Sequence, residues 1–143
     1  MPASVVFPFF ERAENLESIT PPWLGFRVLE APAAPLAAGS VVRYRLRLLG
    51  LPLRWDTRIE RLCRGWGFVD RQTRGPYSSW IHIHLFSPTP GGVVMEDRVD
   101  YRLPLFPLGE LAAPVVRLQL VAIFRYRRRK VEALVRLGFP GAR

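Results

Sequence analysis

The stretch FVDRQTRGPYSSWIHIHLF, residues 68–86, decides the fold prediction. On both sides of Gly75 and Pro76, side chains alternate with a period of two, which is typical of β-strands. The Gly-Pro pair is a strong turn signal. The sequence therefore predicts two neighbouring antiparallel strands, at 67–74 and 79–87.

The same period-two pattern extends in both directions along the chain. It predicts four more strands, near 25–30, 40–49, 53–63 and 93–103. The connecting segments, such as LGLP, CRGWG and SPTPGG, are short and rich in turn residues. Six consecutive strands with tight connections indicate an antiparallel meander.

Helical patterns flank these strands. Residues 4–19 predict two short helices, with Ser4 as the N-cap of the first and Asn15 as the N-cap of the second. Residues 108–136 predict one long helix, in which Pro114 lies early or causes a kink.

The long helix has an unusual distribution of side chains. One side is apolar along its length, with Ala113, Val116, Leu120, Ile123, Phe124, Val131 and Leu134. In the first half the opposite side is also apolar, with Leu111, Val115, Leu118 and Ala122, so we expect that half to be covered on both sides. In the second half the outward residues are Arg125, Arg128, Arg129, Glu132 and Arg136.

Arg127 does not fit this pattern, because it lies at the centre of the apolar stripe. A buried guanidinium needs acceptors, and the candidate partners are Asp70 and Asp97. The alternative is that Arg127 extends to water near the helix end.

Composition and charge narrow the class of protein. A chain of 143 residues with 49% hydrophobic residues is expected to form one globular domain, residues 1–143. The chain has no apolar run of about 20 residues for a membrane span and no secretory signal pattern, so a cytoplasmic location is expected. Cys63, the single cysteine, is expected to be buried.

The net charge of +9 raises the question of nucleic-acid binding. Most of the arginines, such as Arg43, Arg45 and Arg47, alternate along strands and are expected to form a solvated sheet face. The sequence has no zinc finger, RNP motif or GXXG loop, so no specific nucleic-acid partner is expected.

This order of elements, together with PFFERAENLESITPPWLGFRVL, FVDRQTRGPYSSWIHIHLF, DRVDYRLP and LVAIFRYRRR, resembles the SRPBCC superfamily (START/Bet v 1-like, polyketide cyclase/dehydrase), especially its small bacterial ligand-binding members. The resemblance implies an α+β helix-grip fold, in which a curved antiparallel sheet wraps around the long C-terminal helix. It also implies a hydrophobic cavity between the two. Members bind lipids, quinones, polyketides or steroids, and some catalyse cyclisation or dehydration.

The sequence departs from the family at its start. Members have a strand before the two short helices, whereas Met1 here falls almost at the first helix. Either the natural start lies upstream, or the protein lacks this edge strand. A missing strand would leave backbone groups unpaired and invite pairing with a second chain.

Charged residues at alternate positions of two strands, such as Arg58 and Arg98, mark the solvent face and direct the other parity toward the helix. For residues 79–86 parity leaves both faces open, and we favour the aromatic and histidine face as the inner one. The outer face would then carry Ile81, Ile83 and Leu85, which a homodimer interface could cover. The expected ligand-binding residues are Trp55, Thr57, Phe68, Asp70, Gln72, Trp80, His82, His84, Phe86, Met95, Asp97, Tyr101, Leu120, Phe124 and Arg127.

His82 and His84, the only two histidines, allow three interpretations. A metal site with Asp70 or Asp97 lacks a third histidine or a cysteine, so neither a metal nor a cofactor is expected. The two histidines with either aspartate could act as acid and base in a cyclase or dehydratase, although no nucleophile motif such as GxSxG is present.

We favour the third interpretation, a polar cluster that orients a small hydrophobic ligand, such as a lipid, a quinone or a polyketide-like molecule. A separate alternative is an interaction module that binds a protein or an anionic surface through the Arg-rich part of the helix.

Overall fold

The computed structural model describes residues 1–138. Its six strands form one antiparallel sheet in which each strand pairs with the next along the chain. They are β1 (Arg27–Glu30), β2 (Val41–Leu48), β3 (Leu51–Cys63), β4 (Gly67–Arg74), β5 (Ser79–Thr89) and β6 (Gly92–Arg102). All six predicted strands are confirmed, with bounds shifted by a few residues.

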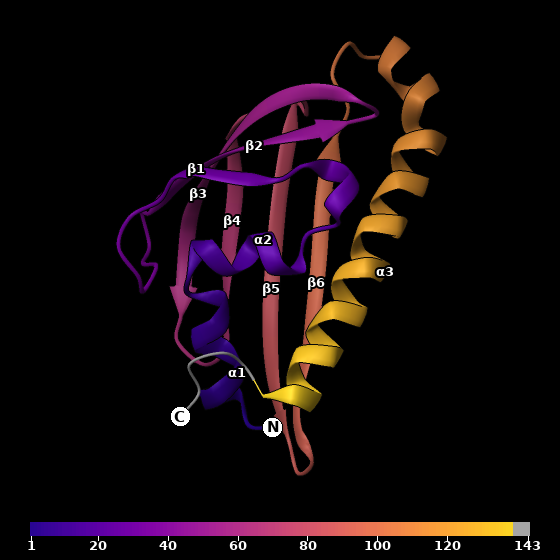
Figure 1. Cartoon of the computed structure of the whole chain (residues 1–143). Coiled ribbons are helices and arrows are strands. Elements are labelled where there is room, and N and C mark those ends of the chain that lie inside the picture. Colours follow the sequence, from indigo (N-terminus) through magenta and orange to yellow (C-terminus); the bar gives the residue numbers. More distant parts are fainter. Residues whose placement is uncertain (139–143) are drawn as a thin grey trace.

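The helices lie on the concave side of this sheet (Figure 1). They are α1 (Ala3–Phe10), α2 (Leu16–Ile19) and α3 (Ala113–Leu137), with short 3-10 helices at Ala13–Asn15, Pro22–Leu24 and Leu108–Ala112. The long helix α3 runs beside β6, and Pro114 lies in its first turn, as predicted. The α+β helix-grip architecture is therefore confirmed.

The strand register brings the inward residues of three strands together. On β5, His82 lies opposite Asp70 of β4 and Val99 of β6, while His84 lies opposite Asp97 of β6. Trp80, His82, His84 and Phe86 are buried, whereas the residues between them are more exposed. The predicted inward face of this strand is confirmed.

Glycine is required where β4 begins. Gly67 has a φ of +156°, and a Cβ built on it would overlap the backbone carbonyl of His84. Any side chain would therefore push β4 away from β5, next to the buried histidines.

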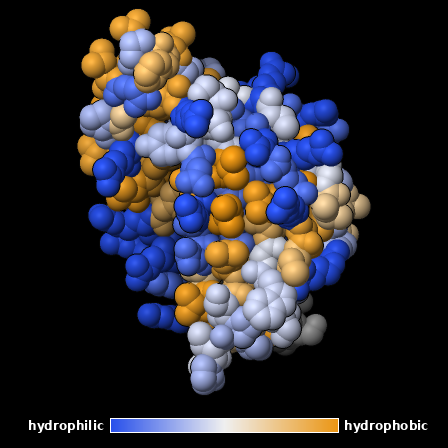
Figure 2. Space-filling view, turned by 180° about the vertical axis from the view of Figure 1, so that it is seen from behind, coloured by the Kyte–Doolittle hydropathy of each residue, from blue (hydrophilic) through white to orange (hydrophobic). Residues whose placement is uncertain are grey.

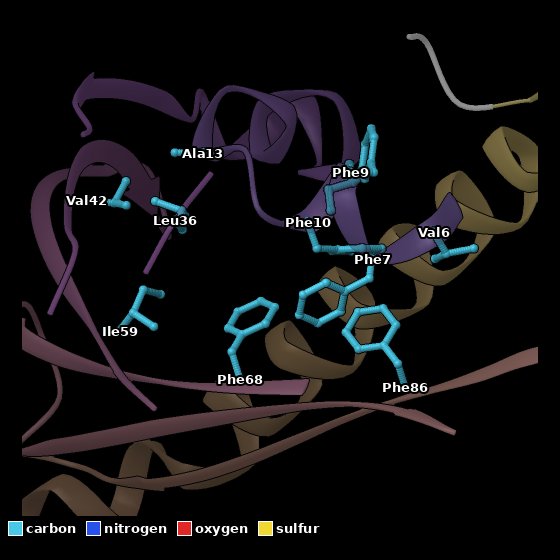
Figure 3. Close-up of a cluster of buried hydrophobic side chains, with 11 residues drawn as sticks. Val6, Phe7, Phe9, Phe10, Ala13, Leu36, Val42, Ile59, Phe68 and Phe86 are labelled. Carbon is cyan, nitrogen blue, oxygen red and sulfur yellow. The ribbon is translucent and has the colours of Figure 1, made fainter. Parts of the chain in front are cut away.

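The core at one end of the sheet is aromatic (Figure 3). Phe7 of α1 contacts Phe86 edge-to-face at 5.1 Å between ring centroids, and Phe10 lies 5.2 Å from the same ring. Phe68 extends this cluster toward the histidines. Buried aromatic pairs of this kind fix the position of α1 across the end of the sheet.

Three local predictions were wrong. Helix α1 begins at Ala3 after Pro2, and Ser4 provides no side-chain cap because it lies inside the first turn. Asn15 precedes α2 but donates its side-chain amide to the Phe9 carbonyl, at 2.8 Å, instead of capping that helix. Cys63 is exposed, since it ends β3 at the edge of a turn.

The prediction that the first half of α3 is covered on both sides was also wrong. Leu111 and Leu118 are 82% and 72% exposed, and Val115 is 50% exposed. The sheet reaches only one side of α3, and no other element of residues 1–138 covers the opposite side. The arginines of the second half, including Arg125 and Arg129, are exposed as predicted. In the described part of the chain, no helix is long and apolar enough to span a membrane.

Two features of the sheet concern the expected homodimer. Leu85 on the convex face is 42% exposed, while Ile81 and Ile83 are half-buried. Among the described residues, β6 has no strand on its outer edge, and no strand precedes α1. The homodimer stays a prediction.

Candidate functional site

A cavity of about 160 Å³ lies between the sheet and α3. Its lining is mostly aromatic and aliphatic, with ionisable side chains on one wall and the hydroxyl groups of Thr20 and Thr57 elsewhere. Ten of the predicted ligand-binding residues line it: Trp55, Thr57, Phe68, Asp70, Trp80, His82, His84, Leu120, Phe124 and Arg127.

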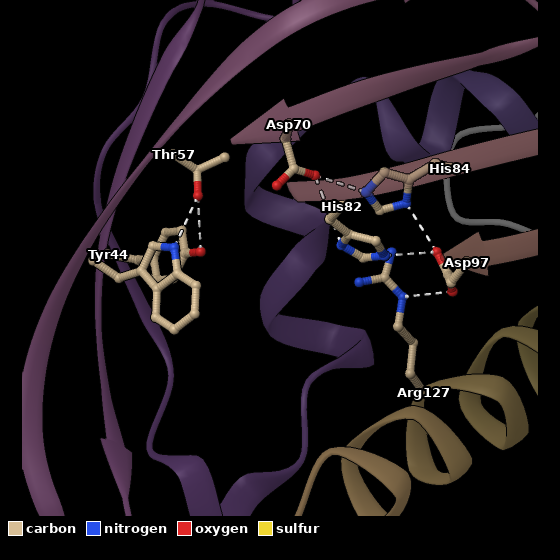
Figure 4. Close-up of polar contacts among 8 residues, drawn as sticks. Tyr44, Thr57, Asp70, His82, His84, Asp97 and Arg127 are labelled. Carbon is tan, nitrogen blue, oxygen red and sulfur yellow. Dashed lines mark hydrogen bonds and ion pairs between the residues drawn. The ribbon is translucent and has the colours of Figure 1, made fainter. Parts of the chain in front are cut away.

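The ionisable group is a cluster of five residues, which we call the His–Asp cluster: Asp70, His82, His84, Asp97 and Arg127 (Figure 4). The two imidazole rings lie 3.7 Å apart between centroids, with their planes tilted by 40°. His84 Nε2 lies 2.8 Å from Asp70 Oδ2, and His84 Nδ1 lies 2.9 Å from Asp97 Oδ1. His82 Nε2 lies 3.1 Å from Asp97 Oδ1, while its Nδ1 lies 3.7 Å from Asp70 Oδ2. Each histidine thus spans the same two carboxylates.

This geometry constrains where the protons lie. A carboxylate can only accept hydrogen bonds, so a nitrogen lone pair close to its oxygen is repelled. His84 Nε2 is hydrogen-bonded to Asp70 at 2.8 Å, whereas its Nδ1, although 2.9 Å from Asp97 Oδ1, is buried without a hydrogen bond in the described chain.

His82 is different. Burial, followed by the charge of His84, lowers the pKa of His82 to about 4, so this ring is neutral near pH 7. It donates one hydrogen bond to Asp97 and leaves Nδ1 with a lone pair. Burial by itself would raise the pKa of Asp97, but Arg127 and the two histidines more than offset this, and the pKa lies well below its usual value.

Arg127 completes the His–Asp cluster from α3. Its Nε lies 3.6 Å from Asp97 Oδ2, so Asp97 is its partner and the alternative that Arg127 extends to water was wrong. The side chain is 13% exposed and lies over the ring of Phe10. Its Nε and Nη2 are buried without a hydrogen-bond partner in the described chain, so Arg127 has donor capacity left for a ligand.

The opposite wall of the cavity has its own polar group. Thr57 Oγ1 lies 3.1 Å from both the Trp55 indole nitrogen and the Tyr44 hydroxyl. Burial raises the pKa of Tyr44 well above its usual value, so this phenol stays protonated. These hydrogen bonds hold Trp55 and Tyr44 as part of the cavity wall.

The other predicted site residues lie outside this cavity. Gln72 hydrogen-bonds the backbone of Tyr77, Phe86 belongs to the aromatic core, and Tyr101 packs against Trp80. Met95 and Asp97 line a second hollow of about 600 Å³ between β6 and the second half of α3. Phe124 and Arg127 line both hollows and therefore separate them.

The sequence analysis missed several lining residues. These are Phe10, Leu16, Thr20, Leu24, Phe26, Leu36, Val42, Tyr44, Leu46, Leu48, Ile59, Tyr77 and Ile123. Alternation along β2 could have indicated Val42, Tyr44 and Leu46. The segment before β1 has no periodicity that identifies its inward side chains.

A metal ion is a further chemical possibility for this wall. Asp70, His82 and His84 each offer a donor atom, and the three atoms lie within 4.8 Å of one another. The expectation that no metal binds stays a prediction.

The chain was compared with known proteins. No protein-family model and no curated protein matches it. Among solved structures it is similar to TTHA0849 from Thermus thermophilus, with 19% identity and a TM-score of 0.67 over 97% of this chain and 92% of that one. It is also similar to Ara h 8.0201, with 13% identity and a TM-score of 0.63 over 93% and 91%.

A third similar structure is the ginseng major latex-like protein 151 from Panax ginseng, with 16% identity and a TM-score of 0.61 over 92% of this chain and 87% of that one. Similarity at this level of identity concerns the fold. The chain has the same helix-grip fold as these structures, a fold of the Bet v 1-like, START type.

Proposed function

We propose that this protein binds a small, mostly apolar molecule that carries a hydrogen-bond acceptor such as a carbonyl oxygen. The observation behind this proposal is that Asp70, His82, His84 and Arg127 of the His–Asp cluster lie together on one wall of a mostly apolar cavity. Burying five ionisable groups costs more free energy than filling the same space with apolar side chains. A role in ligand recognition accounts for their presence.

The size of the cavity limits the ligand. An apolar cavity of about 150 Å³ accommodates a benzene-sized molecule. A volume of about 160 Å³ therefore suits a single-ring compound. A longer quinone or lipid would have to displace α3 or extend past Phe124 into the second hollow.

The polar wall limits the chemistry of the ligand. The spare donors of Arg127 favour a ligand that carries an acceptor oxygen. The apolar body would pack against Trp55, Trp80 and Phe124.

Acetophenone and α-methylstyrene test this proposal, because they have almost the same shape and differ in one carbonyl oxygen. We expect acetophenone to bind at least about tenfold more tightly in calorimetric titration, and this preference to disappear in Arg127→Met. Native mass spectrometry of the protein from its own source should reveal a co-purified molecule. The proposal would be contradicted if neither probe showed saturable binding and the protein from its own source carried no small molecule.

A second function, acid–base catalysis, is favoured by the pairing of His82 with Asp97. Neutral His82 has a free Nδ1, and Asp97 holds its other nitrogen. Such a base could remove a proton from the carbon next to a carbonyl while Arg127 stabilises the enolate. His82 would then return a proton to the same carbon.

This second function has its own test, since proton removal can be followed without knowing the natural substrate. In D₂O, the methyl protons of acetophenone should exchange faster with the wild-type protein than with His82→Gln, as measured by NMR. Equal exchange rates, with acetophenone bound in both, would exclude His82 as the base and leave the binding function intact.

A further inference from the structure

The meander places three connections at the same end of the molecule: the β2–β3 turn, the β4–β5 turn and the segment between β6 and α3 (Figure 1). Large apolar side chains are exposed there. We call this group the apolar end; it consists of Leu49 (68% exposed), Leu51 (66%), Leu105 (80%), Phe106 (82%), Leu108 (71%) and Leu111 (82%). Seen from behind, apolar surface gathers over the region where α3 begins (Figure 2).

The backbone supports a role for these side chains. Leu49 and Leu105 have φ values of 50° and 59°, and they are the non-glycine residues with positive φ in the described chain. Glycine or asparagine would adopt this conformation with less strain. Two leucines therefore occupy strained positions while their side chains lie in solvent, where they gain no burial within residues 1–138.

Exposed arginines surround the apolar end. Arg47, Arg54, Arg74, Arg102 and Arg117 lie at the strand ends and in the first turns of α3, and none of them forms an ion pair within residues 1–138. In the segment 103–118, Glu110 is the only acidic residue. The surroundings of the apolar end are thus strongly basic.

We propose that the apolar end inserts into the head-group region of an anionic phospholipid bilayer, with the surrounding arginines on lipid phosphates. In such a surface the apolar side chains would lie at the boundary of the acyl chains, and the arginines around them would contact the phosphates. A second copy of the chain fits less well, because a symmetric contact would bring two sets of unpaired arginines together.

The same end lies next to the cavity. Leu48 lines the cavity and directly precedes Leu49. Leu103 belongs to the buried cluster with Trp55 and Trp80, and Leu105 follows it two residues later. On the basis of the proposed binding function, the ligand enters and leaves the cavity at the docked end.

This site differs from the Arg-rich second half of α3. Arg125 and Arg129 are exposed there, but Arg128 already pairs with Glu132, and the large exposed apolar side chains of the apolar end are absent between Phe124 and Arg136. The two surfaces can therefore be tested separately.

Co-flotation with vesicles measures the docking. We expect binding to vesicles of phosphatidylcholine with an equal amount of phosphatidylglycerol, weak binding to phosphatidylcholine alone, and a decrease with added salt. The double variant Leu105→Asp/Phe106→Asp should reduce vesicle binding by at least about tenfold. Arg102→Gln/Arg117→Gln should reduce the preference for phosphatidylglycerol.

Leu137→Asp is the matched control, because Leu137 is 84% exposed at the opposite end of α3 and should leave vesicle binding unchanged. Unchanged binding in the Leu105→Asp/Phe106→Asp variant, or loss of binding in Arg125→Gln/Arg129→Gln instead, would overturn the proposal. A different pair of results would also overturn it: the wild-type protein is a dimer in sedimentation and binds no vesicles, and the Leu105→Asp/Phe106→Asp variant is a monomer.

Acetophenone titration in buffer separates this proposal from the binding function. The Leu105→Asp/Phe106→Asp variant should bind acetophenone like the wild type, because neither residue lines the cavity. Vesicle binding without acetophenone binding would support the docking surface and reject the ligand-entry role.

Discussion

The rings of His82 and His84 lie 3.7 Å apart between centroids, yet they contact the same two carboxylates differently. His84 has carboxylate oxygens within 3 Å of both nitrogens, whereas His82 has a close one at Nε2 only. Burial lowers the pKa of His82 to about 4, so its ring is neutral near pH 7 and its Nδ1 offers a lone pair.

Replacement of the two histidines should therefore have unequal effects. His84→Gln removes the buried 2.8 Å hydrogen bond to the Asp70 carboxylate, so we expect a loss of about 2 kcal/mol in the free energy of unfolding. His82→Gln removes the longer, part-buried hydrogen bond to Asp97 and should cost about 1 kcal/mol. Urea denaturation of both variants at pH 7 measures the difference, and a larger loss in His82→Gln would argue against this order.

The stability of the fold should decrease in mild acid because of His82. Its pKa is 6.5 ordinarily and about 4 in the folded chain, so the unfolded chain takes up this proton more readily. The free energy of unfolding should thus fall by up to about 3 kcal/mol as the pH drops from 6.5 to 4, at about 1.4 kcal/mol per pH unit. The low pKa of Asp97 adds a further loss at still lower pH, since its protonation also favours the unfolded chain.

His82→Gln is the control for this pH dependence. The variant should lack the decrease between pH 6.5 and 4 in urea denaturation. A wild-type protein equally stable at both pH values would show that His82 is not buried in its neutral form.

Removal of Arg127 tests the pairing with Asp97. Arg127→Met leaves Asp97 buried with less compensation and should destabilise the fold by about 3 kcal/mol. Adding Asp97→Asn removes the excess charge and should restore at least about 1 kcal/mol. Additive losses in this double-mutant cycle would mean that the two residues do not interact.

The close approach of β4 and β5 gives a structural prediction. Gly67→Ala should destabilise the protein by about 2 kcal/mol or more, because the new methyl group overlaps the His84 carbonyl. Gly91→Ala is the control, since a Cβ there meets no atom within 4 Å. Thermal unfolding compares the two, and similar melting temperatures would contradict the register of β4 and β5.

Much of the sheet could be predicted because charge marks its solvent face. Arg98 and Asp100 on β6 set the parity that directs Asp97 inward, and the structure agrees. On β5 neither face is charged, so alternation alone does not determine whether His82 or Ile81 points inward. The inward direction of His82 was predicted because aromatic side chains with a polar tip suit a ligand cavity.

Other features depended on contacts that local patterns do not encode. The choice of Asp97 as the partner of Arg127 follows from how α3 lies over β6, which no periodicity determines. The exposed side of α3 at Leu118 has the same composition as a buried helix, and only the extent of the sheet shows that it is uncovered. Ser4 failed as a cap because Pro2 begins the helix earlier.

The low pKa of His82 also affects how the whole molecule moves in an electric field. At about pH 5 an exposed histidine carries a positive charge, whereas His82 in the folded chain, with its pKa lowered to about 4, stays mostly neutral. The folded wild-type protein and His82→Gln should therefore migrate alike at this pH. Capillary electrophoresis thus registers a buried neutral ring as an absent difference in mobility, without any probe entering the cavity.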